Sequence, residues 1–192
     1  MRPLVSLTAL ASSLAYIGSD VAELLGHGFS PAQLYVTYAA FVAVPFFILG
    51  LHALQGPRAG WLSLIGAVCY ATSFIFYAGT AVYAIVAGTP DYETLVSEMG
   101  ALYTFHGALL VIGGLLFGAA AIRAAVWPRW TGIALIVGVL LSLFLALVRL
   151  PDIMQTAAST IRSVAFVGMA VAALQQPSIG AVAVETRSGR TS

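Results

Sequence analysis

Residues 130–148 read WTGIALIVGVLLSLFLALV, an unbroken run without a charged side chain. The hydrocarbon core of a bilayer is about 30 Å thick, and a helix needs about 20 mainly apolar residues to cross it. This stretch therefore predicts a membrane-spanning helix. Irregular backbone exposed to lipid would leave its polar groups without hydrogen-bond partners, so we expect the neighbouring spans to be helical as well.

The composition of the whole chain agrees with that prediction, since 60% of its 192 residues are hydrophobic and only 8% are charged. Apolar runs separated by turn signals give six predicted spans, at residues 4–25, 31–54, 60–87, 100–126, 130–148 and 151–174. We predict an all-α, polytopic integral membrane protein, a bundle of six transmembrane helices that forms one domain over residues 1–176. The small, polar residues 177–192 predict a disordered cytoplasmic tail.

Local signals mark several helix ends. Glycines flanking His27 favour the left-handed conformation that closes a helix, and Ser30-Pro31-Ala32-Gln33 has the pattern of a capping box with proline at the first helical position. Apolar residues at helical spacing in the loop 90–99 predict a short interfacial helix over the bundle mouth. Gly114 and Gly118 form a GxxxG step that would let another helix approach closely, although chance spacing is an alternative.

The charged residues give an orientation. In a six-span arrangement one side receives Arg2, Arg58, Arg123, Arg129, Arg187 and Arg190, while the longest loop of the other side carries Asp91, Glu93 and Glu98. Because positively charged loops stay in the cytoplasm, we expect both termini to be cytoplasmic and the chain to cross the inner (plasma) membrane many times. The absence of lysine and asparagine, whose codons are AT-rich, predicts a GC-rich bacterial source.

Charge and cysteine content exclude some functions. The formal net charge is only +1, which argues against a nucleic-acid partner or a polybasic lipid switch. The single Cys69 excludes an internal disulfide framework and a cysteine zinc cluster.

The first span carries the most informative polar pattern. Ser13, Tyr16, Asp20, Glu23 and His27 recur at intervals of three and four residues, so they share one helical face. A single carboxylate in hydrocarbon costs roughly 2.5 to 3.5 kcal/mol on insertion scales. We therefore expect Asp20 and Glu23 to face protein, or a water-filled cavity, rather than lipid.

Topology brings other polar residues to a similar depth, namely Tyr103 and His106 in the fourth span, Arg149 and Asp152 at the next junction, and Arg162 in the sixth span. This predicts a polar pocket in the outer half of the bundle, on the order of 10 Å deep at about 1.5 Å of rise per residue. The residues expected to bind a ligand there are Tyr16, Asp20, Glu23, His27, Tyr103, His106 and Arg162.

Three functions fit this pocket. The first is binding or transport of a small amphipathic or cationic ligand, with Asp20 and Glu23 as charge centres and Arg162 as counter-ion. The second is an intramembrane enzyme that uses Asp20 or Glu23 in acid/base catalysis on a lipid or isoprenoid. The third is a structural subunit of a membrane complex, in which the charges only pair with one another. The expected partners are membrane lipids and a hydrophobic or cationic small molecule, and a homo-oligomer is left open.

A metal site on the same residues is another interpretation of the pattern. Glu23 and His27 lie four residues apart on one helical face, and Asp20 and His106 could complete a ligand set. The spacing alone is common, and no HExxH motif or cysteine pair supports it, so we predict neither a metal nor another cofactor.

Overall fold

The computed structural model of the chain describes residues 1–148 and 152–176. Its helices are α1 (Arg2–Gly26), α2 (Pro31–Gln55), the short 3-10 helix η1 (Gly56–Arg58), α3 (Gly60–Ala87), α4 (Tyr92–Ala124), α5 (Arg129–Leu147) and α6 (Asp152–Gln175). Each predicted span overlaps one of the six α-helices. The tail predicted over residues 177–192 and the predicted pocket residue Arg149 lie outside the described residues.

All six α-helices are long and apolar enough to cross a membrane. Large apolar side chains cover the outer surface of the bundle, where Phe46 is 72% exposed and Val86 is 83% exposed. Such a surface is stable in lipid and unstable in water, because the hydrophobic effect opposes the hydration of so much apolar area. The predicted fold class, an all-α bundle of six membrane-spanning helices, is confirmed.

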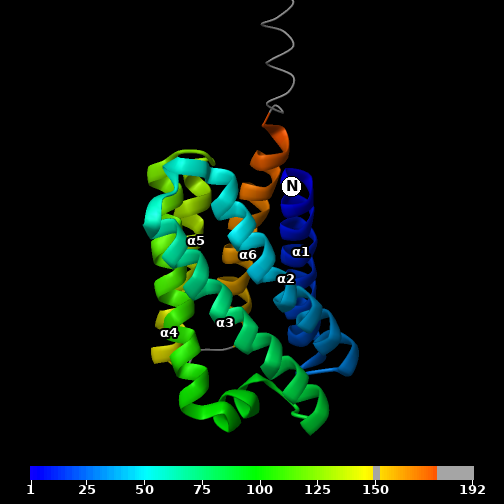
Figure 1. Cartoon of the computed structure of the whole chain (residues 1–192). Coiled ribbons are helices and arrows are strands. Elements are labelled where there is room, and N and C mark those ends of the chain that lie inside the picture. The colour runs from blue at the N-terminus through cyan, green and yellow to red at the C-terminus, as the bar shows by residue number, and fades with distance from the viewer. Residues whose placement is uncertain (149–151, 177–192) are drawn as a thin grey trace, which may run out of the picture.

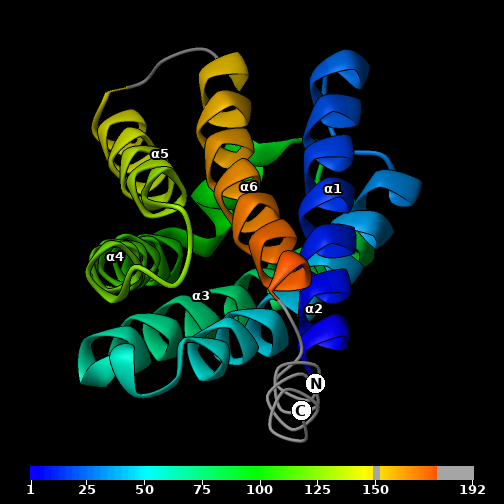
Figure 2. The same cartoon turned by 90° about the horizontal axis from the view of Figure 1, so that it is seen from above.

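The helices form a closed ring in chain order. Each helix packs mainly on its neighbours in the sequence, and α6 returns to pack along α1 (Figure 2). Helices on opposite sides of the ring make few contacts with one another, and the main such contact joins α2 to α6. The interior of the ring is therefore filled by side chains and not by a central helix.

The two ends of the bundle carry opposite charge. The N-terminus and the last turn of α6 lie at the same end (Figure 1). We call this the arginine end, because Arg2, Arg58, Arg123 and Arg129 lie at the helix ends there. We call the opposite end, where Asp91, Glu93 and Glu98 lie in and beside the α3–α4 connection, the acidic end.

Glycines set the closest helix contacts. A Cβ atom on Gly118 of α4 would lie 3.0 Å from the carbonyl oxygen of Gly132 in α5, which confirms the close approach predicted from the GxxxG step. The tightest contact between helix backbones was not predicted. It joins α3 to α4, where a Cβ atom on Gly66 would lie 2.5 Å from the Phe117 nitrogen and one on Gly113 would lie 2.6 Å from the Tyr70 nitrogen.

The helix ends agree with the sequence signals in part. His27 itself, and not a flanking glycine, takes the left-handed conformation after α1, with φ of 54°. Ser30 caps α2 as predicted, with its Oγ accepting from the Gln33 nitrogen at 3.3 Å. The residues from Tyr92 onward are helical, as predicted for the loop 90–99, and non-helical angles at Gly100 separate them from the rest of α4.

Candidate functional site

The polar face of α1 leads from the acidic end into the interior of the ring. His27 at the helix end is exposed, Glu23 and Asp20 are half-buried, and Tyr16 lies among buried aromatic rings. At 1.5 Å of rise per residue, Asp20 lies about 9 Å inside the end of α1. The stripe predicted from spacing therefore faces protein and becomes less accessible with depth.

Asp20 joins α1 to α6. Its Oδ2 atom accepts a hydrogen bond from the hydroxyl of Ser159, which is 4% exposed and lies 2.9 Å from the Thr156 carbonyl oxygen of its own helix. A hydroxyl that donates to a carboxylate compensates part of the free energy that the carboxylate loses on leaving water. Ser159 thus gives Asp20 a fixed partner on the neighbouring helix.

Arg162 lies one turn further along α6 and is the most buried charged side chain among the described residues, at 8% exposure. Its Nη1 donates to the Ser142 hydroxyl of α5, so the guanidinium ties α5 to α6. The Nε atom is buried and has no hydrogen-bond partner among the described residues. The guanidinium also interacts electrostatically with the Asp20 carboxylate and with the hydroxyls of nearby tyrosines.

A small cavity lies beside Arg162, between α1, α2, α3 and α6. Three serines contribute to its wall, Ser12, Ser13 and Ser163, together with Tyr16 and Tyr70. The space open to the centre of a water molecule is about 10 Å³, which is the volume of about one water molecule on that measure. Most of the surface that faces this space is apolar, and its size leaves room for no more than one small guest.

Aromatic side chains fill the ring from this cavity to the acidic end. Successive ring centroids lie 5.1 to 5.8 Å apart along a continuous ladder that comprises Phe166, Tyr70, Phe74, Tyr77, Tyr103 and Tyr92. Tyr16 and Phe41 pack edge-on against Phe74. Such T-shaped pairs present ring edges to ring faces and hold the aromatic core in fixed geometry.

The two predicted site residues of α4 belong to this aromatic core. Tyr103 packs against Phe76 and Tyr77. His106 stacks on Phe76 with ring centroids 3.9 Å apart, and its Nδ1 lies 2.8 Å from the Leu102 carbonyl of its own helix. Neither residue makes a hydrogen bond to Asp20 or Arg162 in the described part of the chain.

Glu23 belongs to a second polar cluster between α1 and α2. Gln33 donates from Nε2 to the Ser19 and Thr37 hydroxyls at 2.9 and 3.1 Å, and Glu23 accepts from the same nitrogen at 3.5 Å. Gln33 therefore turns inward instead of completing the predicted capping box. Its Oε1 atom is buried without a partner among the described residues.

The structure gathers Tyr16, Asp20 and Arg162 around one region, places Glu23 one turn closer to the acidic end, and leaves His27 at the surface. Within residues 1–148 and 152–176, no three His, Cys, Asp or Glu side chains gather closely enough to hold a metal ion. Asp20, Glu23, His27 and His106 accordingly do not converge on a common point there.

Sequence reasoning missed the serine partners of the two central charges. Ser159 and Ser142 lie on α6 and α5, and no spacing signal marked them among the many serines and threonines of the chain. Tyr70 was also missed, although it is 1% exposed and lines the cavity beside Arg162. Arg162 was the available signal, since an arginine inside a predicted span requires polar partners on adjacent helices.

Comparison with known proteins gave no significant similarity to any protein-family model, to any curated protein or to any solved structure. The fold defines the class of protein, a multi-span α-helical membrane protein. A functional proposal must therefore rest on the chemistry of its residues.

Proposed function

We propose that the protein binds or transports a small cationic ligand at Asp20, next to Arg162, in the half of the bundle nearer the acidic end. The observation that carries the proposal is the graded polar face of α1, which runs from exposed His27 through Glu23 to Asp20. Ionisable residues inside a membrane are costly, and they commonly mark ion or proton pathways. A carboxylate at the inner end of such a path supplies the charge that attracts a cation.

The room beside this site limits the size of the ligand. The cavity is lined by Tyr16, one helical turn from Asp20 on α1, and it holds about one water molecule. This size suits a proton carried by a water molecule and excludes larger cations. Asp20, Ser159, Tyr16 and Tyr70 carry groups that can donate or accept a proton, and the two tyrosines line the cavity. A larger amphipathic ligand would require the helices of the ring to separate.

The aromatic ladder supports the same ligand class. Tyrosine and phenylalanine faces attract cations, and this attraction grows where water is excluded. On the side toward the arginine end, fully buried apolar residues close the ring beyond the cavity, among them Ile48, Leu51 and Met169. Binding from the acidic end needs no movement of this apolar plug, whereas transport requires it to open.

We further propose that the arginine end faces the cytoplasm of a bacterial cell and that the membrane is the plasma membrane. The support is the separation of arginines and carboxylates between the two ends of the bundle, which matches the charge bias of inserted membrane proteins. The acidic end, and with it the entrance to Asp20, would then face outward.

The test is a flux measurement on the full chain in liposomes that contain a pH-sensitive dye. Wild-type protein should collapse an imposed pH gradient faster than protein-free liposomes, and Asp20→Asn should remove this activity. Glu93→Gln is the matched control, because it makes the corresponding acid-to-amide change at an exposed position of the acidic end. The binding part is measured by infrared spectroscopy, as a component of the acidification difference spectrum in the carboxyl region that is present in wild type and in Glu93→Gln in its own variant-specific form, and whose Asp20 contribution is lost in Asp20→Asn.

The proposal is wrong if Asp20→Asn behaves as wild type in both measurements. Absence of both the flux and the carboxyl band in wild type would instead favour the structural subunit. That alternative is supported by one observation, namely that Asp20 and Arg162 each already have a serine partner. An enzyme acting on lipid or isoprenoid is less well supported, because its substrate would need a chamber far larger than about 10 Å³.

A further inference from the structure

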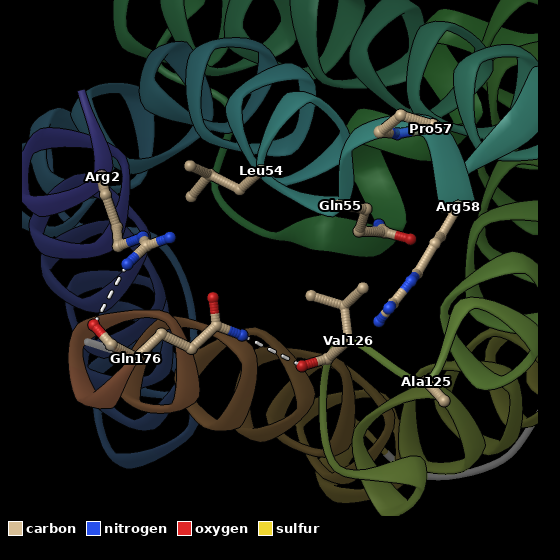
Figure 3. A pocket seen from close by; sticks show the side chains of 8 residues that line it. All are labelled: Arg2, Leu54, Gln55, Pro57, Arg58, Ala125, Val126 and Gln176. Carbon is tan, nitrogen blue, oxygen red and sulfur yellow. Dashed lines mark hydrogen bonds between the residues drawn. The ribbon is translucent and has the colours of Figure 1, made fainter. Parts of the chain in front are cut away.

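The two ends of the ring are closed in different ways. At the arginine end a cavity of about 450 Å³ remains between the start of α1, the end of α2 with η1, the α4–α5 connection and the last turn of α6 (Figure 3). At the acidic end, the chain that joins α3 to the long part of α4 lies across the ring (Figures 1 and 2). We call residues 90–99 of this connection the cover segment.

A glycine bend joins the cover segment to the rest of α4. Gly100 has φ of 53° and ψ of −126°, which are not helical angles. Residues with a side chain rarely adopt a positive φ, whereas glycine does so at little cost. A Cβ atom on Gly100 would meet no atom of the described residues within 4 Å, so packing does not confine the bend. The backbone can therefore change direction at this point while the helix that follows keeps its place.

Hydrogen bonds fasten the cover segment to its neighbours. The backbone N–H of Phe29, in the α1–α2 connection, donates to the Pro90 carbonyl oxygen at 2.8 Å. The Thr89 hydroxyl donates to Oε2 of Glu98 at 3.2 Å, and the Thr89 backbone N–H donates to the Ala84 carbonyl of α3 at 3.1 Å. The Glu98 side chain is thus a latch between the cover segment and the end of α3.

The cover segment packs on a small apolar cluster. Leu95 is 5% exposed and belongs to the same cluster as Leu34 of α2 and Ala84 of α3. This cluster is separate from the large aromatic core of the ring. A segment held by a small cluster opens at a lower cost in free energy than the core beneath it. The cover segment is therefore suited to move while the bundle stays folded.

Tyr92 connects the cover segment to the Asp20 site. Its ring ends the aromatic ladder at the acidic end, with its centroid 5.8 Å from that of Tyr103. The Tyr92 hydroxyl also interacts electrostatically with the carboxylates of Glu23 and Asp20. These contacts lie where the polar face of α1 enters the ring, so a movement of the cover segment would uncover that face.

We propose that the cover segment is a lid that opens about Gly100 and controls the access of water and protons from the acidic end to Asp20. This inference rests on the proposed function, because it concerns access to the same carboxyl group. The structure shows the lid closed, with Leu95 and the Glu98 latch holding it down. Opening breaks these contacts and leaves the six spanning helices in place.

The first measurement detects the opening without any use of transport. In a Cys69→Ser background, Ala84→Cys places a thiol in the cluster under Leu95, and Ala67→Cys places one in the same helix but in the main core; both alanines are fully buried. A small, polar thiol reagent is added to the full chain in a nonionic detergent. Ala84→Cys should react at least about ten-fold faster than Ala67→Cys, because opening of the lid exposes only the first.

Matched variants test the latch. Glu98→Ala removes the acceptor of the Thr89 hydroxyl and should speed the labelling of Ala84→Cys by about five-fold, the factor expected for loss of one hydrogen bond. Thr89→Val removes the donor and should act in the same direction. Glu93→Ala makes the acid-to-alanine change at an exposed position of the same segment and should leave the labelling rate within about two-fold.

The second measurement connects the lid to Asp20. Thr89→Cys and Glu98→Cys, combined in the Cys69→Ser background, place two thiols at the latch, and a short, reducible thiol cross-linker joins them. In liposomes that contain the full chain, cross-linking should slow the collapse of a pH gradient by about ten-fold or more, because the lid can no longer open. Reduction of the cross-link should restore the rate. Each single-cysteine variant, treated with the same reagent, is the control.

Several results would overturn the lid. Equal labelling of Ala84→Cys and Ala67→Cys would do so, and so would a flux that cross-linking leaves unchanged. If Ala84→Cys does not fold, hydrogen exchange of the wild type keeps the test decisive, because the backbone amides of residues 93–99 should exchange faster than those of α3, and equal protection would contradict the proposal. A wild type without flux would contradict the proposed function, and the labelling rates would still decide whether the lid opens.

Discussion

The Asp20–Arg162 region and the cavity at the arginine end place positive charge in opposite surroundings. Arg162 is buried, donates a hydrogen bond to Ser142 and lies beside room for about one water molecule. Arg2 and Arg58 lie beside about 450 Å³ of open space at the helix ends. A charge in the packed interior must be satisfied by side chains of adjacent helices, whereas a charge at a helix end can also be hydrated.

The same comparison shows how position along a membrane helix controls what a polar residue can do. In the interior, a charge must find partners on adjacent helices, and the serines of α5 and α6 supply them. At a helix end, a side chain can reach the aqueous interface, so an arginine there keeps its hydration.

The largest effect is expected at Arg162. Arg162→Met removes the positive charge that interacts with Asp20 and should lower the free energy of unfolding by about 3 to 5 kcal/mol, as for other broken buried charge pairs. Thermal unfolding in detergent, followed by circular dichroism, measures this loss. The double variant Asp20→Asn/Arg162→Met should lose less than Arg162→Met alone, because no uncompensated charge remains. If the two losses simply add, the residues are not coupled.

The next effect concerns the wall of the ring. Gly66→Ala places a Cβ atom against the α4 backbone and should destabilise the protein by about 1 to 3 kcal/mol through overpacking. Gly79→Ala, in the same helix, meets no atom within 4 Å and should be neutral or stabilising by up to about 1 kcal/mol, as alanine favours helix more than glycine does. Unfolding measurements that gave both variants the same stability would contradict the close α3–α4 contact.

A smaller effect of opposite sign is expected at Gln55. Its buried amide has no hydrogen-bond partner among the described residues. Gln55→Leu replaces this amide with an apolar side chain of similar size and should raise the free energy of unfolding by about 1 kcal/mol. Thermal unfolding in detergent measures the change. A variant less stable than wild type would show that the amide has a structural role and would contradict the account of this group.

The smallest effect lies at the cap of α4. The Thr94 backbone N–H donates to Asp91 Oδ1 at 2.8 Å, and this hydrogen bond holds the pKa of the Asp91 carboxyl below its usual value. Because the pKa is lower in the folded chain, the carboxylate stabilises the fold above the pKa of the unfolded chain. That contribution disappears as the pH falls through the lowered value.

Asp91→Ala should therefore lower stability by about 1 kcal/mol near neutral pH, the usual cost of losing a helix cap. The difference from wild type should shrink when thermal unfolding is repeated well below pH 3.9, the usual pKa of aspartate. Asp91→Asn is the control, since asparagine also caps helices and does not titrate. A difference between Asp91→Ala and wild type that did not change with pH would contradict the account of this cap.

Much of the fold follows from the sequence, because a membrane span needs a long apolar run and the chain has six of them. The closest helix pair did not follow. With 19 glycines in the chain, nothing marks Gly66 and Gly113 as partners, since their contact depends on how α3 and α4 are rotated and tilted. Helix phase predicted that Asp20 faces inward, but it could not identify Ser159, because the depth at which α6 meets α1 depends on packing.

The cavity at the arginine end was missed for a different reason. Gln55-Gly56-Pro57 has the pattern of a turn that ends a span, and it does end α2. Whether a glutamine at such a turn is hydrated or buried depends on the distant segments that cover it. Here those segments include the start of α1 and the end of α6, which no local pattern relates to residue 55.

The central claim is that Asp20 is reached from the acidic end and carries the proton exchange of the protein. The most direct test measures the collapse of a pH gradient in liposomes for the wild type and for one variant in each region. We expect Asp20→Asn to lose the flux, and Glu93→Gln at the acidic end and Arg58→Gln at the arginine end to keep it. Equal flux in Asp20→Asn and wild type, or an equal loss in all three variants, would contradict the account.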